Sequence, residues 1–313
     1  METNKNTLPT ESDDVFLTDG GLETTLIFLE GFDLPCFAAF DLLKHQPGYK
    51  AIKNYYKRYL NIAKKYKTNF ILETPTWRAN PDWIQRIGYP RDELSALNKK
   101  AVVLLAELKT IFEKDIHSIL ISGCIGPRGD GYVPENCMSI EEAEAYHSDQ
   151  IKALNIAPVD FVSALTMNYV EEVIGIVKAA ENVNTPVVIS FTVETDGKLP
   201  TGMSLKEAIQ KVDKSVSVPP LYYMINCAHP AHFFKELKED ENWIKRIKGI
   251  RANASCKSHA ELDESTVLDR GIPKELGKEY KKLKDSFDHL NVFGGCCGTD
   301  EEHLVEIIEQ IRS

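Results

Sequence analysis

The chain has 313 residues, of which 43% are hydrophobic, enough to build one large core. Its formal net charge is -10, which disfavours a nucleic-acid partner and leaves small molecules as the expected partners. The polar N-terminus has no apolar segment of a signal peptide, and no run approaches eighteen apolar residues. These features predict a cytoplasmic protein without membrane contact.

Two kinds of segment alternate along the chain after a polar leader. Residues 1–14 are rich in Thr, Glu, Asp and Asn, which predicts a flexible or loosely attached leader. From residue 15 to residue 313, short β-branched runs alternate with longer segments of helical periodicity. The runs are VFLTDG, NFILET, SILISGCIGP, DFVSALT, PVVISFTV, LYYMINC, IKGIRANAS and LNVFGGCC.

Helices are expected between these runs, among them residues 47–67, 139–157, 168–183 and 300–313. Two of them have the spacing of a capping box, Ser139 with Glu142 and Thr299 with Glu302. Gly88 and Pro90 split the helix of the second unit, and residues 256–273 are expected to form a long loop.

The alternation gives eight strand-helix units, which predicts a single-domain (β/α)8 TIM barrel of the α/β class over residues 15–313. A doubly wound open sheet is the alternative, but no GxGxxG motif follows the first strand.

Chemistry in such a barrel lies at the carboxyl ends of the strands. The residues expected there are Asp19, Gly20, Glu73, Thr74, Cys124, Leu165, Thr166, Glu194, Asn226, Cys227, Ser255, Cys256, Cys296 and Cys297. Cys227, Cys296 and Cys297 would supply three soft ligands of a zinc site with an open fourth position. Neighbouring side chains of an extended strand point to opposite faces, so the turn-forming glycines Gly294, Gly295 and Gly298 would have to bring both sulfurs inward. Inert buried cysteines are an equally open interpretation, whereas a disulfide between neighbouring cysteines would be strained.

Four motifs give the chain a resemblance to a known family. They are TDGGLETTL, LETPTWRAN, INC and GGCCGT. With them the chain resembles, from about Val15 to Ile311, the homocysteine S-methyltransferase family of zinc-dependent barrel enzymes. The resemblance implies that Cys227, Cys296 and Cys297 hold Zn2+ and carry catalysis.

The resemblance also implies a substrate site and a reaction. Asp19 and Gly20 match a turn that contacts homocysteine, Thr74 matches a residue near its carboxylate and amino group, and Asn226 lies in the same wall. A methyl group would pass from a sulfonium or quaternary ammonium donor, such as S-methylmethionine or betaine, to the homocysteine thiolate, giving methionine. The oligomeric state stays open.

Aromatic faces suit a cationic methyl donor, and Trp77 is the first candidate, followed by Phe191 and Tyr132. Arg78 is either a carboxylate clamp or a solvated surface arginine. The turn-rich segment 124–139 is expected to form a rigid lid, with Arg128 and Asp130 entering the pocket or pairing with each other.

One position departs from the family pattern. Leu165 stands where family members commonly carry a Glu that accepts a hydrogen bond from the substrate amino group. Either another carboxylate, from Glu23, Glu73 or Glu194, replaces it, or the acceptor is a different small thiol. A zinc- and thiol-binding barrel without turnover is the alternative from another class, and an all-cysteine ligand set argues against a zinc hydrolase.

Overall fold

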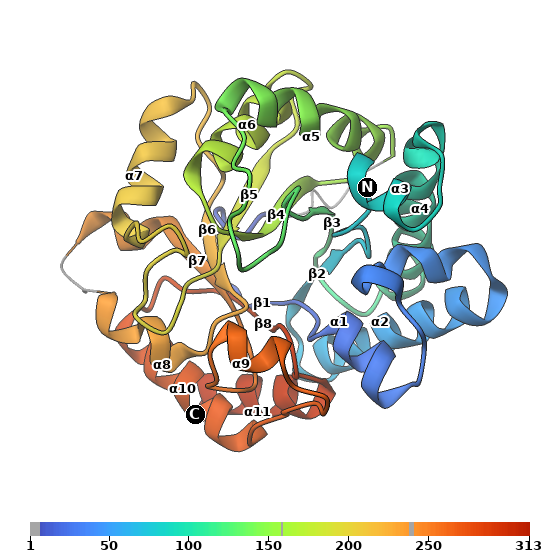
Figure 1. Cartoon of the computed structure of the whole chain (residues 1–313). Coiled ribbons are helices and arrows are strands. Elements are labelled where there is room, and N and C mark those ends of the chain that lie inside the picture. The colour runs from blue at the N-terminus through green and yellow to red at the C-terminus, as the bar shows by residue number, and fades with distance from the viewer. Residues whose placement is uncertain (1–6, 158, 238–240) are drawn as a thin grey trace, which may run out of the picture.

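Eight parallel strands close into a barrel in chain order, from β1 to β8 (Figure 1). The computed structural model describes residues 7–157, 159–237 and 241–313. Phe16 of β1 pairs with Asn69 of β2 on one side and with Val292 of β8 on the other, which completes the ring. The strands are β1 Phe16–Leu17, β2 Asn69–Glu73, β3 Ile119–Ile125, β4 Phe161–Met167, β5 Val187–Phe191, β6 Tyr223–Asn226, β7 Ile247–Ala252 and β8 Val292–Gly295. The predicted TIM barrel is thereby confirmed.

Helices form an outer ring around the strands (Figure 1). They are α1 Leu22–Thr24, α2 Gln46–Tyr66, α3 Pro81–Arg86, α4 Leu94–Phe112, α5 Ile140–Asn155, α6 Val170–Glu181, α7 Leu205–Ser215, α8 Pro230–Phe233, α9 His259–Asp263, α10 Pro273–Ser286 and α11 Glu301–Ile311. The split second helix is confirmed by α3 and α4, and α9 lies within the predicted loop 256–273. Within the residues that the structure describes, no helix is both long and apolar enough to cross a membrane.

One predicted helix cap is confirmed and the other is wrong. The Glu142 amide donates to Ser139 Oγ over 3.2 Å and the Ser139 amide donates back to Glu142 Oε2 over 2.8 Å. At α11 the cap is Asp300 rather than Thr299, because the Thr299 hydroxyl donates to the Cys296 carbonyl over 2.7 Å. Thr299 thus stabilises the turn that contains the cysteines and does not cap the helix.

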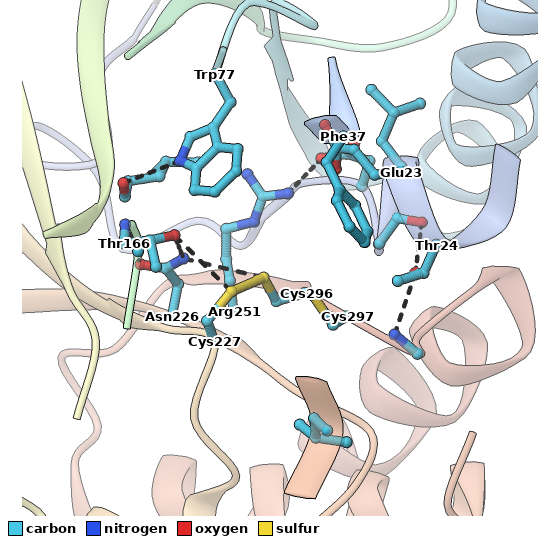
Figure 2. Close-up of a pocket in the computed structure, with 18 of the residues that line it drawn as sticks. Glu23, Thr24, Phe37, Trp77, Thr166, Asn226, Cys227, Arg251, Cys296 and Cys297 are labelled. Atoms are coloured by element: carbon cyan, nitrogen blue, oxygen red, sulfur yellow. Dashed lines mark hydrogen bonds and ion pairs between the residues drawn. A yellow bond between two sulfur atoms is a disulfide. The ribbon is translucent and has the colours of Figure 1, made fainter. Parts of the chain in front are cut away.

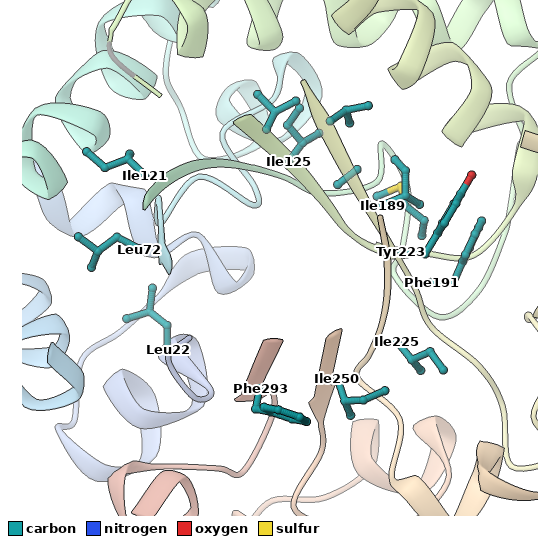
Figure 3. Close-up of a cluster of buried hydrophobic side chains, with 14 of the residues drawn as sticks. Leu22, Leu72, Ile121, Ile125, Ile189, Phe191, Tyr223, Ile225, Ile250 and Phe293 are labelled. Atoms are coloured by element: carbon teal, nitrogen blue, oxygen red, sulfur yellow. The ribbon is translucent and has the colours of Figure 1, made fainter. Parts of the chain in front are cut away.

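Alternate residues of each strand supply two apolar layers. Leu72, Ile121, Ile189 and Ile225 belong to the layer between strands and helices, shown in Figure 3. Their chain neighbours Ile71, Leu120, Val188 and Met224 belong instead to the cluster that fills the barrel. The barrel interior is therefore a packed core below the carboxyl ends of its strands, and ligands of such barrels bind above this core.

The described part of the predicted leader is attached to the barrel. Leu8 packs against the interior cluster, and Asn291 Nδ2 donates to the carbonyls of Pro9 and Ser12 over 2.8 Å each. Ser118 Oγ donates to the Thr7 carbonyl over 3.3 Å. Residues 7–14 thus lie against the end of the barrel opposite the carboxyl ends of the strands, and the rest of the predicted leader, residues 1–6, lies outside the described residues.

Candidate active site

A pocket of about 320 Å³ opens at the carboxyl ends of the strands, within the size range of small-molecule sites. The three proposed zinc ligands line it, together with Asp19, Gly20, Glu23, Thr74, Trp77 and Asn226. Its lining includes Asp19, Gly20, Glu23, Phe37, Glu73, Thr74, Trp77, Arg78, Cys124, Asp130, Tyr132, Leu165, Thr166, Asn226, Cys227, Arg251, Cys296 and Cys297. We call this end of the barrel its mouth.

Cys227 reaches the pocket through a strained backbone at the end of β6. Its φ is +54°, a left-handed conformation that costs a residue with a Cβ about 1–2 kcal/mol. Its amide donates to the Arg251 carbonyl over 3.1 Å, and its own carbonyl accepts from Asn253 Nδ2 over 3.0 Å. The surrounding hydrogen bonds therefore hold this residue in a conformation that it would not prefer alone.

A four-residue turn after β8 presents the other two cysteines. The Thr299 amide donates to the Cys296 carbonyl over 3.1 Å, and Gly298, the third residue of the turn, has a φ of +79°. A glycine is favoured there because the left-handed backbone penalises a Cβ. Adjacent cysteines can thus share one site because Cys297 already lies in the turn.

Gly294 and Gly295 have a different role from the one predicted. Neither has a positive φ among the described glycines, so they do not supply the turn. A Cβ on Gly294 would lie 1.8 Å from Thr18 Oγ1, and one on Gly295 would lie 2.0 Å from Thr299 Oγ1. These glycines allow close approach of neighbouring segments, and the turn itself depends on Gly298.

The three cysteine sulfurs form one cluster in Figure 2, all within 4.8 Å of one another. The structure joins Cys227 and Cys296 as a disulfide, so the bonded pair is not the neighbouring one. Zinc–sulfur bonds of 2.3 Å in a tetrahedron place sulfurs about 3.8 Å apart. Once reduced, the three thiols fit a zinc ion with one position left open. The remaining cysteines lie outside the cluster: Cys124 is buried in the pocket wall, and Cys36, Cys137 and Cys256 are exposed.

Asn226 braces the wall beside the cysteines. Its Oδ1 accepts from the Thr166 amide over 2.9 Å and from Ser190 Oγ over 2.6 Å. Its Nδ2 donates to Thr166 Oγ1 over 2.8 Å and lies 3.9 Å from Cys296 Sγ. With its amide group occupied in this way, Asn226 positions β4 and β6 relative to the cysteine cluster.

Asp19 is held by a buried arginine that the sequence analysis missed. Arg251 Nη2 donates to Asp19 Oδ1 over 2.6 Å, and Tyr55 donates to Asp19 Oδ2 over 3.1 Å. Arg251 Nη1 also lies 3.7 Å from Glu73 Oε1. The signal was present in the sequence, because Arg251 stands near the carboxyl end of the run IKGIRANAS, where side chains of a barrel meet the pocket.

Three acidic side chains of the mouth have raised pKa values. Burial raises the pKa of Asp19, which Arg251 partly offsets. Burial also raises the pKa of Glu73 to about 7, against the lowering effect of Arg251 and with a further rise from Asp19. Loss of solvent in the pocket likewise raises the pKa of the half-buried Glu23 to about 7. Such shifts are common at functional sites, where charged groups have been withdrawn from water.

Arg78 is buried, which excludes the surface role that the sequence left open. Its side chain lies in the pocket wall with 7% exposed. The guanidinium carbon lies 3.9 Å from the ring centroid of Trp77 and 3.8 Å from that of Trp83. Trp77 is itself fixed, since its Nε1 donates to the Leu165 carbonyl over 3.2 Å.

Thr74 and Tyr132 also lie at the mouth. Thr74 makes hydrogen bonds that join the ends of β2 and β3, and Tyr132 lies beside the Cys297 sulfur. Thr74 Oγ1 accepts from the Cys124 amide over 2.8 Å and contacts Thr76 Oγ1 at 2.6 Å. The Tyr132 hydroxyl lies 3.9 Å from Cys297 Sγ, and its ring stacks on His259 at 3.9 Å between centroids.

Several side chains proposed from the sequence lie away from the pocket or make other contacts. Phe191 stacks on Tyr223 in the layer outside the barrel, and Glu194 contacts His259 Nδ1 at 3.1 Å without lining the pocket. Of the two alternatives for Arg128 and Asp130, entry into the pocket holds for Asp130, which lines it, whereas Arg128 pairs with Asp82, its Nε 2.8 Å from Asp82 Oδ2. The Asp130 carboxylate caps its own loop, accepting from the amides of residues 132 and 133.

Comparison with known proteins gives relatives that match almost the whole chain. Two are plant proteins called homocysteine S-methyltransferase 1, from Arabidopsis thaliana and Brassica oleracea var. italica. Each is 26% identical to this chain, over 95% of this chain and 93% of its own length.

Among solved structures, the homocysteine methyltransferase MmuM from Escherichia coli has the same fold. Its oxidised form matches with a TM-score of 0.73 at 17% identity over 98% of both chains. Its metallated form matches with a TM-score of 0.73 at 18% identity over 96% of both chains.

The family model described as homocysteine S-methyltransferase matches residues 16–311, almost the whole chain. That span includes β1 through α11 and every residue that lines the pocket. The chain therefore belongs to the homocysteine S-methyltransferase family.

Proposed function

We propose that this S-methyltransferase uses zinc to transfer a methyl group from a sulfonium or quaternary ammonium donor to homocysteine. The observation that carries the proposal is the cluster of Cys227, Cys296 and Cys297, whose sulfurs lie within 4.8 Å of one another at the mouth. Three thiolates and an open fourth position suit a zinc site that also takes a substrate thiol. The reduced chain offers these ligands, so the reaction requires the Cys227–Cys296 disulfide to be opened.

Zinc bound there would hold the acceptor sulfur as its thiolate, since a coordinated thiol loses its proton near neutral pH. The thiolate electron pair forms the new sulfur–methyl bond. The bond from the methyl carbon to the positively charged sulfur or nitrogen of the donor breaks, and its electron pair stays with the departing neutral atom. Charge and atoms balance without a further reactant. The residues of the mouth must therefore bind the acceptor, exclude water and hold the donor in line.

We assign the acceptor's amino group to Glu23. Leu165 offers no charge at the end of β4, and both oxygens of Asp19 already accept hydrogen bonds from Arg251 and Tyr55. Glu73 has Arg251 as its cationic neighbour. Glu23 lines the pocket and, among the described residues, has no ion pair within 4 Å. An ammonium would supply the opposite charge that this desolvated carboxylate lacks. Asp19, Gly20, Thr74, Trp77 and Asn226 complete the proposed substrate site.

A different small thiol remains the second candidate for the acceptor, because Leu165 places an apolar side chain where an ammonium would need a partner. Homocysteine and its analogue without the amino group separate these possibilities. If Glu23 binds the ammonium, Glu23→Gln slows methylation of homocysteine and leaves the analogue unaffected. The cytoplasmic location inferred from the sequence stays a prediction.

The test of zinc dependence is a substitution in the cluster. Reduced Cys297→Ala should lose stoichiometric zinc together with methyl transfer from S-methylmethionine to homocysteine, because two cysteines hold a zinc ion weakly. The matched control is Cys256→Ala, which removes an exposed cysteine outside the cluster. Metal analysis and circular dichroism are recorded on both variants. Full zinc content in Cys297→Ala would contradict the ligand assignment.

A further inference from the structure

We propose that Arg78 binds the carboxylate of the methyl donor and so determines which onium donors the site accepts. The inference rests on the proposed function, since it deepens the description of the donor. It assigns a specificity-determining role to a residue that lies outside the cysteine cluster and outside the acceptor contacts. Its basis is an unusual environment for a buried cation.

Arg78 is buried without a carboxylate in ion-pair contact, and Asp130 and Glu23 act on it only from a greater distance. Among the described residues, no carboxylate lies within 4 Å of its guanidinium, unlike Arg251, which has two. Its only hydrogen bond within that part of the chain runs from Nη1 to the Gly129 carbonyl over 2.9 Å, and Nε is buried with no acceptor. Burial lowers the pKa of Arg78, but only to about 10, so the side chain is positively charged at neutral pH. A buried charge in this state is normally paired.

The guanidinium is also fixed in place before any ligand arrives. It lies between the rings of Trp77 and Trp83 at 3.9 Å and 3.8 Å. Trp83 Nε1 donates to the Arg128 carbonyl over 2.9 Å, and Trp77 Nε1 donates to the Leu165 carbonyl. Stacking covers the flat faces of a guanidinium and leaves its hydrogen-bond donors at the edge, which suits a planar carboxylate. Such preorganisation reduces the entropy lost on binding.

The position of Arg78 favours the donor over the acceptor as the source of that carboxylate. The acceptor sulfur must reach the cysteines at the ends of β6 and β8, so the methyl carrier must approach from the other side. Figure 2 shows the Trp77 and Phe37 rings on the side of the pocket away from the cysteine sulfurs. Arg78 follows Trp77 and contacts the loop after β3 through Gly129. Aromatic faces for the onium methyl groups and a cation for the carboxylate thus lie together.

The experiment compares donors that differ in the carboxylate. Reduced, zinc-loaded full-length protein is assayed with dimethylsulfoniopropionate and S-methylmethionine, and with trimethylsulfonium, which lacks a carboxylate. Arg78→Gln should lower kcat/KM for the two carboxylate donors by about 10–100-fold through the donor KM, the effect of losing one charged hydrogen-bonded pair. The homocysteine KM, the zinc content and the rate with trimethylsulfonium should stay within about twofold. Arg128→Gln, at an exposed site paired with Asp82, is the matched control and should leave all values unchanged.

Three outcomes would overturn the proposal. An unchanged donor KM in Arg78→Gln would remove the role of Arg78. A rise in the homocysteine KM instead would assign the carboxylate to the acceptor, and equal loss with trimethylsulfonium would show a structural effect only. If no donor methylates homocysteine, the proposed function fails. Titration calorimetry with dimethylsulfoniopropionate then tests separately whether Arg78 binds the donor. Wild-type binding that Arg78→Gln weakens at least tenfold supports the site, and equal binding by both contradicts it.

Discussion

Two buried arginines at the mouth have opposite surroundings. Arg251 lies between carboxylates, 2.6 Å from Asp19 and 3.7 Å from Glu73, and it donates a further hydrogen bond to the Gly295 carbonyl. Arg78 lies between two indole rings and has no carboxylate within 4 Å in the described part of the chain. Both side chains are 6–7% exposed, so burial alone does not distinguish them. The difference teaches that a buried charge serves the framework when the protein neutralises it, and is available to a ligand when the protein does not.

The largest expected effect comes from removing the paired arginine. Arg251→Met should lower the free energy of unfolding by about 3–5 kcal/mol, because it leaves two buried carboxylates without their cation. Arg78→Met should change it by no more than about 1 kcal/mol, since the lost stacking is offset by removal of an unpaired buried charge. Denaturant unfolding of both variants measures the difference. Equal losses would show that the two arginines have the same structural role.

The next effect concerns the dependence of stability on pH. Burial raises the pKa of Glu73 to about 7 from an ordinary value of 4.5, so the folded state keeps a proton that the unfolded state has released. The contribution of this group to stability is therefore complete below pH 4.5 and is lost as the pH rises through about 7. Between pH 5 and pH 8 the loss should be about 2–3 kcal/mol.

Glu73→Gln should remove that part of the pH dependence, because glutamine does not titrate. Unfolding free energies at pH 5 and pH 8 should then differ less than in the wild type by about 2–3 kcal/mol. Glu275→Gln, at an exposed site on α10, is the control and should keep the wild-type difference. A wild-type slope in Glu73→Gln would mean that Arg251 keeps Glu73 ionised throughout this range.

The smallest expected effect concerns Trp83, the second of the two indole rings that stack on Arg78. Trp83→Leu removes one of its two stacking faces and should raise the KM of a carboxylate donor only two- to fivefold, in line with about 0.5–1 kcal/mol for one cation–π contact. Trp83→Phe keeps an aromatic face and should stay closer to the wild type. A loss as large as that of Arg78→Gln would show that Trp83 does more than hold the guanidinium.

The sequence predicts the barrel well because each strand is a short β-branched run followed by a helical segment. It also predicts the three cysteines as one site, since Cys227, Cys296 and Cys297 all stand at strand ends. The salt bridge between Arg251 and Asp19 joins residues 232 positions apart. The two residues come within reach only when the barrel closes, because β8 then pairs with both β7 and β1. No local pattern contains that information.

Loop contacts and shared hydrogen bonds account for the other differences. Trp83 stacks on Arg78 because α3 returns over the loop after β2, a path that residue types do not specify. Thr299 has the right spacing for a cap, but its hydroxyl donates a hydrogen bond to the Cys296 carbonyl instead. In both cases the tertiary structure supplies a partner that the local sequence does not predict.

β8 pairs with β7 and with β1, and the turn after it carries two of the three cysteines. Pairing of β8 therefore closes the ring and brings Cys296 and Cys297 beside Cys227 in one step. A chain truncated before β8 would lack both the closed barrel and two of the three sulfurs proposed as zinc ligands. The barrel and the proposed zinc site are therefore expected to form together.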